Sequence, residues 1–177
     1  MEIYLIRHTQ PDIQRGICYG QSDIPLGEDF IQSAEIIKQN LSDLAFDQVF
    51  SSPLIRCKML ADKLFDSFTT SSLLIEMNFG KWEGTAWDDI FKDDDGREWF
   101  ENYLTHPCPD GESFIDLQKR VKKFVESLNF NHQKIALVTH AGIIRAFRMI
   151  YENLKPDTIF SEKIQFGEIS IINLKYH

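Results

Sequence analysis

Short apolar runs alternate along this chain with segments of helical periodicity, and this alternation restricts the possible folds more than any other feature. The short runs predict buried strands, at residues 3–6, 47–50, 72–75, 135–139 and 169–174. The periodic segments predict helices, at residues 28–44, 53–65, 113–128 and 140–151. Strands that alternate with helices predict an α/β fold, a three-layer sandwich whose mostly parallel central sheet is flanked by helices.

Two of the predicted helices begin at recognisable capping residues. Ser52 precedes Pro53, which favours a helix with Ser52 as its cap and Pro53 in its first turn. Ser113 and Asp116 have the spacing of a capping box, with Asp in place of the usual Glu. The helix that begins at Ser113 is the clearer of the two, because apolar residues then recur at three- and four-residue intervals as far as Leu128.

The length and charge of the chain exclude several classes of protein. Its 177 residues suit one domain, 1–177, which buries a core without disulfides or metals. The net charge of −8 argues against nucleic-acid binding, which needs a basic surface. The apolar runs are too short to span a membrane, and residues 1–8 lack the pattern of a secretory signal. The 3 cysteines have no metal-ligand spacing and are expected to be free thiols, so we expect a cytoplasmic protein.

Residues 76–112 are less regular and rich in aromatic and acidic side chains, which predicts a cap-like insertion in the domain. Two interpretations of the aromatic residues stay open: they stack on a flat base in a ligand, or they form the core of a small helical cap. The acidic residues at 88–95 do not match an EF-hand, because Phe91 and Asn102 stand where acids are needed. We therefore expect a solvated acidic surface there and no metal site.

Basic residues follow three predicted strands at the point where each strand ends. Arg7 and His8 follow the first strand, Arg56 lies shortly after the second, and His140 follows the strand at 135–139. In open α/β sheets, ligands bind beyond the carboxyl ends of the strands, where helix N-termini add positive potential. The pattern predicts a pocket for a compact anion such as phosphate. A structural histidine and a solvated arginine are the simpler interpretations of each residue taken alone.

Five segments, in order, resemble the motifs of the histidine phosphatase superfamily, which has the phosphoglycerate mutase-like fold. Residues 5–9 (LIRHT) are similar to its Arg-His-Gly or Arg-His-Thr motif, and residues 51–57 (SSPLIRC) to its Ser-x-x-x-x-Arg-Ala segment. Residues 76–84 (EMNFGKWEG) resemble its Glu-x-x-x-Gly-x-Trp-Glu-Gly segment. Residues 109–113 (PDGES) and 138–142 (VTHAG) resemble its Gly-Glu-Ser stretch and its second histidine motif.

The resemblance implies phosphoryl transfer without a metal ion or other cofactor. His8 is the expected nucleophile; one ring nitrogen forms a phosphohistidine, while the other is expected to donate to a carbonyl and so fix the tautomer. Arg7, Arg56 and His140 are expected to bind the phosphate oxygens and to stabilise the transition state. Glu76 is the expected general acid for the leaving group and then the base for the attacking water.

Residues 16–23 (GICYGQSD) and the Arg-His-Thr form of the first motif are most similar to α-ribazole phosphatases, which remove the 5′-phosphate of α-ribazole phosphate during cobalamin assembly. Two positions depart from the family pattern: Gln10 stands where a glutamate is frequent, and Gln14 stands where an asparagine touches the phosphate. The residues expected to bind the substrate are Gln14, Tyr19, Gly20, Gln21, Ser22 and Trp82.

Other functions stay open at this point. Within the family, the alternatives are a broad-specificity sugar-phosphate phosphatase and a phosphoglycerate mutase. The alternative from another class is a non-catalytic sensor of phosphorylated ligands. The expected partner is a small-molecule phosphate ester, with neither nucleic acid nor membrane involved, and a homodimer is one alternative for the oligomeric state.

Overall fold

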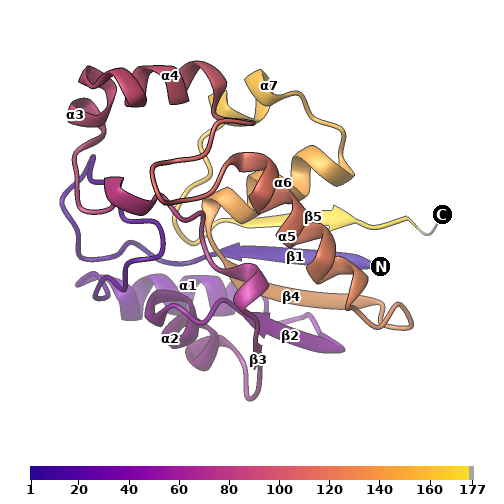
Figure 1. Ribbon diagram of the computed structural model, residues 1–177. Helices are drawn as coiled ribbons and strands as arrows, with labels where there is room; N and C mark the ends of the chain where they lie inside the picture. Colours follow the sequence, from indigo (N-terminus) through magenta and orange to yellow (C-terminus); the bar gives the residue numbers. More distant parts are fainter. Residues whose placement is uncertain (176–177) are drawn as a thin grey trace.

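The computed structural model of the protein, which describes residues 1–175, contains a five-stranded sheet in the order β3–β2–β4–β1–β5 (Figure 1). The strands are β1 (Glu2–Arg7), β2 (Gln48–Ser51), β3 (Thr69–Thr70), β4 (Lys134–Thr139) and β5 (Ile169–Asn173). The first four are parallel to one another, and β5 pairs antiparallel with β1. The predicted α/β fold with a mostly parallel sheet is confirmed.

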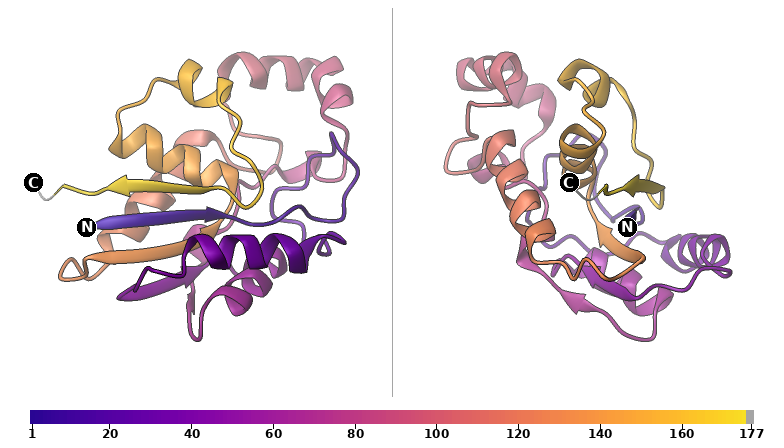
Figure 2. Two further views of the ribbon diagram at one scale, coloured as in Figure 1. Left: turned by 180° about the vertical axis from the view of Figure 1, so that it is seen from behind. Right: turned by 90° about the vertical axis from the view of Figure 1, so that its right-hand side faces the viewer.

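Helices cover both faces of the sheet, so that three layers are visible (Figures 1 and 2). One layer holds α1 (Phe30–Asn40) and α2 (Ile55–Leu64), and the other holds α5 (Phe114–Glu126) and α6 (Ala141–Tyr151). The shorter helices are α3 (Trp87–Lys92), α4 (Asp94–Asn102) and α7 (Pro156–Ser161), and the 3-10 turns are η1 (Ser72–Leu74) and η2 (Gly80–Trp82). Among the helices of residues 1–175, none has the length and apolar content needed to cross a membrane.

Alternate residues of β1 and β4 face opposite helical layers, which explains why the middle of each strand, 3–6 and 135–138, is apolar without interruption. Odd-numbered residues pack with α5 and α6, and even-numbered residues pack with α1 and α2. The odd set is Ile3, Leu5, Ile135 and Leu137, and the even set is Tyr4, Ile6, Ala136 and Val138. A slip of one residue would exchange the two faces, so this pattern holds the register that sets Arg7 opposite Thr139.

The two predicted capping residues have different outcomes. The helix from Ser113 is confirmed as α5, where the Ser113 hydroxyl accepts a hydrogen bond from the N–H of Asp116 (3.3 Å) and the Asp116 carboxylate accepts one in return (3.3 Å). The predicted cap at Ser52 is wrong. α2 begins only at Ile55, and its N-cap makes no side-chain hydrogen bond. The Ser52 hydroxyl accepts a hydrogen bond from the N–H of Leu54 (3.4 Å), just before the helix, and lies 2.7 Å from the ring of His140.

Two further predictions are corrected by the structure, and one helix was not predicted. Residues 72–75 do not form a strand, because the Ser71 hydroxyl accepts a hydrogen bond from the N–H of Leu73 (3.3 Å) and favours the turn η1; the strand β3 lies just before it. The helix predicted at 28–44 is shorter, because turns replace it after Asn40. The helix α7 escapes the sequence analysis, since its 6 residues are too few to show a helical period.

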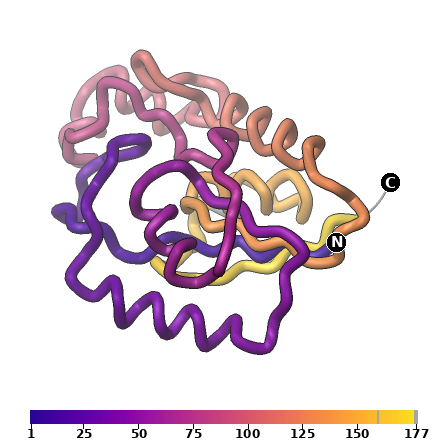
Figure 3. Tube along the Cα trace, turned by 90° about the horizontal axis from the view of Figure 1, so that it is seen from below, coloured from indigo at the N-terminus to yellow at the C-terminus, as the bar shows by residue number. Residues whose placement is uncertain are grey.

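The segment 76–112, which contains α3 and α4, lies beyond the carboxyl end of β1 in the left view of Figure 2. It is joined to the loop at 8–29 by backbone hydrogen bonds. The N–H of Cys18 bonds the carbonyl of Thr85 (2.9 Å), and the N–H of Gly84 bonds the carbonyl of Cys18 (2.7 Å). The two segments lie side by side in Figure 3. Together they stand over the end of the sheet where the basic residues are found.

Aromatic side chains form the interior of this segment. Trp82 and Trp99 are buried and meet edge to face, with 5.5 Å between ring centroids. Phe91 and Phe100 are exposed. For the two buried tryptophans, the structure favours the interpretation of a small helical core over that of a stacking surface.

Candidate active site

The carboxyl ends of β1 and β4 bring two histidines together. His8 follows β1, and its N–H bonds the carbonyl of Thr139 at the end of β4 (3.0 Å). His140 follows Thr139, and its ring centroid lies 5.2 Å from that of His8. The two residues are 1% and 0% exposed, so both are almost fully removed from water. The strand ends therefore converge as the sequence predicts.

One ring nitrogen of His8 is engaged by the backbone. Nδ1 lies 2.7 Å from the carbonyl oxygen of Thr9, and a carbonyl only accepts, so Nδ1 carries the proton and donates it. Nε2 therefore keeps its lone pair, as a nucleophile requires. Burial and the charge of Arg56 hold the pKa of His8 well below its usual 6.5, against the smaller opposing effect of the hydrogen bond to Thr9. The ring is neutral at neutral pH.

Two arginines at this edge of the sheet donate to backbone carbonyls. Arg56 is fully buried and donates to the carbonyls of Gly20 (2.6 Å) and Ser22 (2.8 Å). Arg7 donates to the carbonyl of Ile164 (2.5 Å). The Nε–H group of each arginine is buried without a partner among the described residues. Because a buried unpaired donor is costly, each Nε–H group would gain from an acceptor such as a phosphate oxygen, provided that the site opens enough to admit it.

The ring of Phe166 covers Arg7 and His8. Its ring centroid lies 3.8 Å from the guanidinium carbon of Arg7 and 5.5 Å from the ring centroid of His8. The N–H of Gly167 lies 3.2 Å from the carbonyl oxygens of both Arg7 and His8. Phe166 lies outside every motif of the sequence, so nothing in the local pattern points to it.

His140 contacts a hydroxyl and a thiol. Its Nε2 lies 2.7 Å from Oγ of Ser52 and 3.5 Å from Sγ of Cys57. Burial holds the pKa of His140 well below its usual 6.5, and the charge that His8 would carry if protonated and the charge of Arg56 act in the same direction. Ser52 and Cys57 therefore orient a neutral ring. The sequence does not predict this contact. Ser52 and Cys57 belong to the motif at 51–57, but both lie far from His140 along the chain.

Both carboxylate oxygens of Glu76 accept hydrogen bonds from the backbone. Oε1 accepts from the N–H of Met77 (2.8 Å), and Oε2 accepts from the N–H of Gly142 (3.2 Å). Gly142 lies in the first turn of α6, two residues after His140. This contact ties the carboxylate to the same helix N-terminus that positions the second histidine.

Tyr19 lies among the charged groups of the site. Its ring centroid is 5.2 Å from the guanidinium carbon of Arg56. Burial raises the pKa of Tyr19, and the charges of Arg7, Arg56 and Glu76 all act on its hydroxyl. A cavity of about 610 Å³ opens beside it, with Arg7 and the exposed Gln14 in its lining. Tyr19 therefore lies within electrostatic reach of Glu76 and both arginines and lines the same cavity as Arg7.

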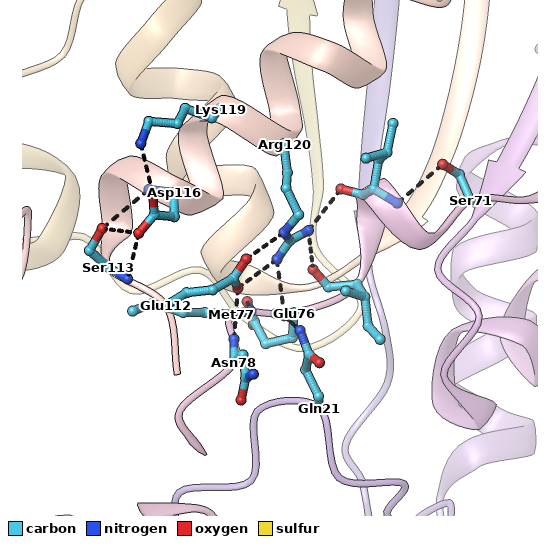
Figure 4. Close-up of polar contacts among 12 residues, drawn as sticks. Gln21, Ser71, Glu76, Met77, Asn78, Glu112, Ser113, Asp116, Lys119 and Arg120 are labelled. Carbon is cyan, nitrogen blue, oxygen red and sulfur yellow. Dashed lines mark hydrogen bonds and ion pairs between the residues drawn. The ribbon is translucent and has the colours of Figure 1, made fainter. Parts of the chain in front are cut away.

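The predicted substrate residues Gly20, Gln21 and Ser22 form a loop that is held from two sides. Arginine donors bind its carbonyls, and Glu83 accepts hydrogen bonds from the N–H groups of Gln21 and Ser22 (2.8 Å each). The side-chain amide of Gln21 also donates to the carbonyl of Glu76 (2.9 Å; Figure 4). Glu83 is the glutamate of the Trp-Glu-Gly motif, so the sequence singles it out. The motif alone does not show which groups the Glu83 carboxylate binds.

The predicted substrate residue Trp82 is 8% exposed and packs in the hydrophobic core. A cavity of about 110 Å³ borders Glu76, and its lining includes Arg145 and several aromatic rings.

The site offers cationic side chains rather than metal ligands. Among residues 1–175, no group of three or more His, Cys, Asp and Glu side chains is placed to hold a metal ion. Arg7 ends β1 and Arg56 lies in the first turn of α2, so both bring positive charge to this edge of the sheet. Planar guanidinium groups of this kind bind phosphate oxygens in pairs.

Comparison with known proteins agrees with this geometry. The profile of the histidine phosphatase superfamily (branch 1) matches residues 3–177. An adenosylcobalamin/alpha-ribazole phosphatase of Escherichia coli K12 is 31% identical over 154 residues, which cover 81% of this chain and 75% of that protein. Phosphoserine phosphatase 1 of Hydrogenobacter thermophilus is 27% identical over 155 residues, which cover 82% of this chain and 74% of that protein. A crystal structure of phosphoglycerate mutase from Thermus thermophilus superposes on this chain with a TM-score of 0.80 at 27% identity. The superposition covers 98% of this chain and 93% of that one. The predicted phosphoglycerate mutase-like fold is confirmed.

The buried histidines make stability depend on pH. Below pH 6.5 the unfolded chain binds a proton on each imidazole, whereas folded His8 and His140 stay neutral, so the free energy of unfolding falls as the pH is lowered. Each histidine contributes a slope of up to about 1.4 kcal/mol per pH unit. We expect His8→Gln to make the dependence shallower between pH 6.5 and 5, as measured by urea unfolding at each pH. An unchanged slope would contradict the neutral, buried state of His8.

Proposed function

This chain belongs to the histidine phosphatase superfamily (branch 1), and we propose that it hydrolyses phosphate monoesters through a phosphohistidine on His8. The observation that supports this most directly is the short contact between Nδ1 of His8 and the carbonyl of Thr9 (2.7 Å). That hydrogen bond leaves Nε2 unprotonated and free to attack. The neutral state of the ring, which burial favours, keeps this nucleophile available over a wide pH range.

The reaction has two steps. In the first, the lone pair of His8 Nε2 attacks phosphorus, the bond from phosphorus to the ester oxygen breaks, and the carboxylic acid of Glu76 gives its proton to that oxygen. In the second, the Glu76 carboxylate takes a proton from water, the water oxygen attacks phosphorus, and the phosphorus–nitrogen bond breaks. Inorganic phosphate leaves, and both side chains return to their starting states.

Arg7, Arg56 and His140 bind the non-bridging oxygens during both steps. The unpaired Nε–H groups of the two arginines support this role, since they are donors without an acceptor among the described residues. Fixed donors that face developing charge lower the barrier of phosphoryl transfer. We propose that these side chains supply the charge stabilisation and that the reaction needs no metal ion.

The substrate that we propose is α-ribazole 5′-phosphate. The relative of 31% identity from Escherichia coli is named for this activity. The cavity of about 610 Å³ beside Arg7 includes Tyr19, Trp87 and Phe166 in its lining. Aromatic walls of this kind suit a flat, apolar base.

Phosphoserine is a second candidate substrate. A relative of 27% identity is a phosphoserine phosphatase. The cavity of about 110 Å³ beside Glu76 is too small for a nucleoside, and Arg145 contributes to its lining. A compact leaving group with a carboxylate fits that combination. A broad sugar-phosphate phosphatase, a phosphoglycerate mutase and a non-catalytic sensor are the remaining alternatives.

We further propose that the protein acts in the cytoplasm on a small-molecule phosphate ester, without nucleic acid or membrane. Its cysteines support a reducing location, because Cys18, Cys57 and Cys108 are all buried free thiols. Burial raises the pKa of each thiol, that of Cys108 to about 12, so none of them is a reactive thiolate.

Phosphate release tests the proposed function. We expect the wild type, in excess EDTA, to release phosphate faster from α-ribazole 5′-phosphate than from phosphoserine, sugar monophosphates or 3-phosphoglycerate. His8→Ala should lower the rate by at least about 1,000-fold, because it removes the nucleophile. His106→Ala, at a partly exposed histidine outside the site, is the matched control and should leave the rate unchanged.

Each alternative gives a different result in this assay. Preference for phosphoserine would replace the proposed substrate with the second candidate, and similar rates on every ester would indicate broad specificity. Isomerised phosphoglycerate would indicate a mutase. Loss of activity in EDTA would contradict metal independence, and binding without turnover would favour the sensor.

Gly142→Ala tests the role of Glu76. A Cβ atom on Gly142 would stand 2.2 Å from Oε1 of Glu76, so the flexible carboxylate must move away. We expect the rate on alkyl phosphates to fall about 100-fold, the scale of general acid–base catalysis. The free energy of unfolding should change by less than about 1 kcal/mol, since alanine favours the helix. Steady-state kinetics and thermal unfolding measure the two effects.

The Glu76→Gln background supplies the control for this prediction. If Gly142→Ala acts through the carboxylate, it should cost little further activity in a protein that already carries Glu76→Gln. Additive losses in the double variant would mean that Gly142→Ala acts by another route.

A further inference from the structure

A partly buried ion pair holds the segment that carries Glu76. Arg120 lies on α5 and Glu112 lies just before that helix, with side chains that are each 19% exposed. We propose that this pair is the positioning element for the general acid: it places the Glu76 backbone so that the carboxylate meets the leaving oxygen. This inference rests on the proposed function and names residues that act through Glu76 rather than on the substrate.

All five N–H donors of Arg120 have an acceptor (Figure 4). Nε and one terminal nitrogen donate to the two oxygens of Glu112 (2.7 and 2.9 Å). The other terminal nitrogen donates to the carbonyls of Leu73 and Ile75 (3.0 Å each). A third carbonyl, that of Glu76 itself, accepts at 3.3 Å. One side chain thus binds three carbonyls of the segment that leads into the general acid.

Glu112 holds the other end of the same segment. Its Oε2 accepts a hydrogen bond from the N–H of Asn78 (2.9 Å), and its own N–H donates to the carbonyl of Asn78 (2.8 Å). The pair therefore binds the chain on both sides of Glu76, at Ile75 and at Asn78.

The segment needs these partners because it has no regular structure of its own. The turn η1 ends at Leu74 and η2 begins at Gly80, so residues 75–79 lie between elements. Nothing in a sheet ladder or a helix determines where the Glu76 backbone stands. Side-chain hydrogen bonds to its carbonyls do so instead, and a shift of about 1 Å in a catalytic group is enough to slow a reaction substantially.

A displaced general acid has a characteristic kinetic effect. An alkyl ester needs a proton on its leaving oxygen, whereas 2,4-dinitrophenolate leaves without one. Loss of positioning should therefore slow the phosphorylation of His8 by alkyl phosphates and spare phosphorylation by 2,4-dinitrophenyl phosphate. A merely structural role for Arg120 would slow both esters alike or neither.

The experiment measures His8 phosphorylation in a single turnover with both esters. We expect Arg120→Gln to slow the alkyl ester about 30-fold while the dinitrophenyl ester changes by less than about 3-fold. Arg120→Lys keeps the charge opposite Glu112 but has three donors in place of five, so it should show the same selectivity to a smaller degree. Because Arg120→Lys retains the ion pair, it provides the second measurement if Arg120→Gln does not fold.

Arg148→Gln is the matched control. Arg148 on α6 is also largely buried, at 21% exposed, and pairs with the carboxylates of Glu152 and Glu162, but it makes no hydrogen bond to residues 73–78. Its loss removes the ion pairs of an arginine whose burial is similar to that of Arg120, and should not change the ratio of the two rates. A change in that ratio for Arg148→Gln as large as for Arg120→Gln would overturn the inference.

Glu76→Gln separates failure of this inference from failure of the proposed function. If Glu76→Gln slows only the alkyl ester and neither Arg120 variant does, the positioning role is wrong and the general acid stands. If Glu76→Gln does not discriminate between the esters, the proposed role of Glu76 is wrong. If the wild type forms no phosphohistidine with either ester, the proposed function itself is wrong.

Discussion

The parallel pairing of β1 with β4 is the constraint on which the site depends. It sets Arg7 opposite Thr139 and so places His8 and His140 beside each other, just beyond the strand ends. Apolar side chains that alternate between two helical layers hold this register, because a slip would turn each strand toward the wrong core. The geometry of two histidine rings is therefore tied to the packing of the whole sheet.

Burial at the same edge of the sheet determines the chemistry. Water is excluded from His8, His140 and Arg56, and exclusion favours the neutral imidazole while an arginine remains charged. The hydrogen bonds of Arg56 go to the neutral carbonyls of Gly20 and Ser22 rather than to a carboxylate. A positive potential thus persists within a chain of net charge −8, and it suits a phosphate group.

The loops of the site are held by side chains that bind backbone groups. Glu83 and Arg56 hold opposite sides of the loop at 20–22, and Arg120 with Glu112 holds the segment around Glu76. These segments lie outside the sheet and the helices, so their N–H and carbonyl groups find partners in charged side chains that are wholly or partly buried. Such contacts are directional, which gives irregular backbone a defined position without regular secondary structure.

By itself, the sequence determined the features that depend on local pattern: the α/β class, β1 and β4, the capped start of α5 at Ser113, and the motif residues at the strand ends. Prediction from local pattern was wrong at 72–75, where a turn replaces the expected strand. It was also wrong at Ser52, whose hydroxyl contacts the distant ring of His140. Only the tertiary structure decided that Ser52 meets His140, 88 residues away, that Phe166 covers His8, and that Arg120 binds the carbonyls before Glu76. The physical reason is that strand and helix patterns arise from neighbours along the chain, whereas these contacts join side chains to segments that only the packed sheet brings within reach.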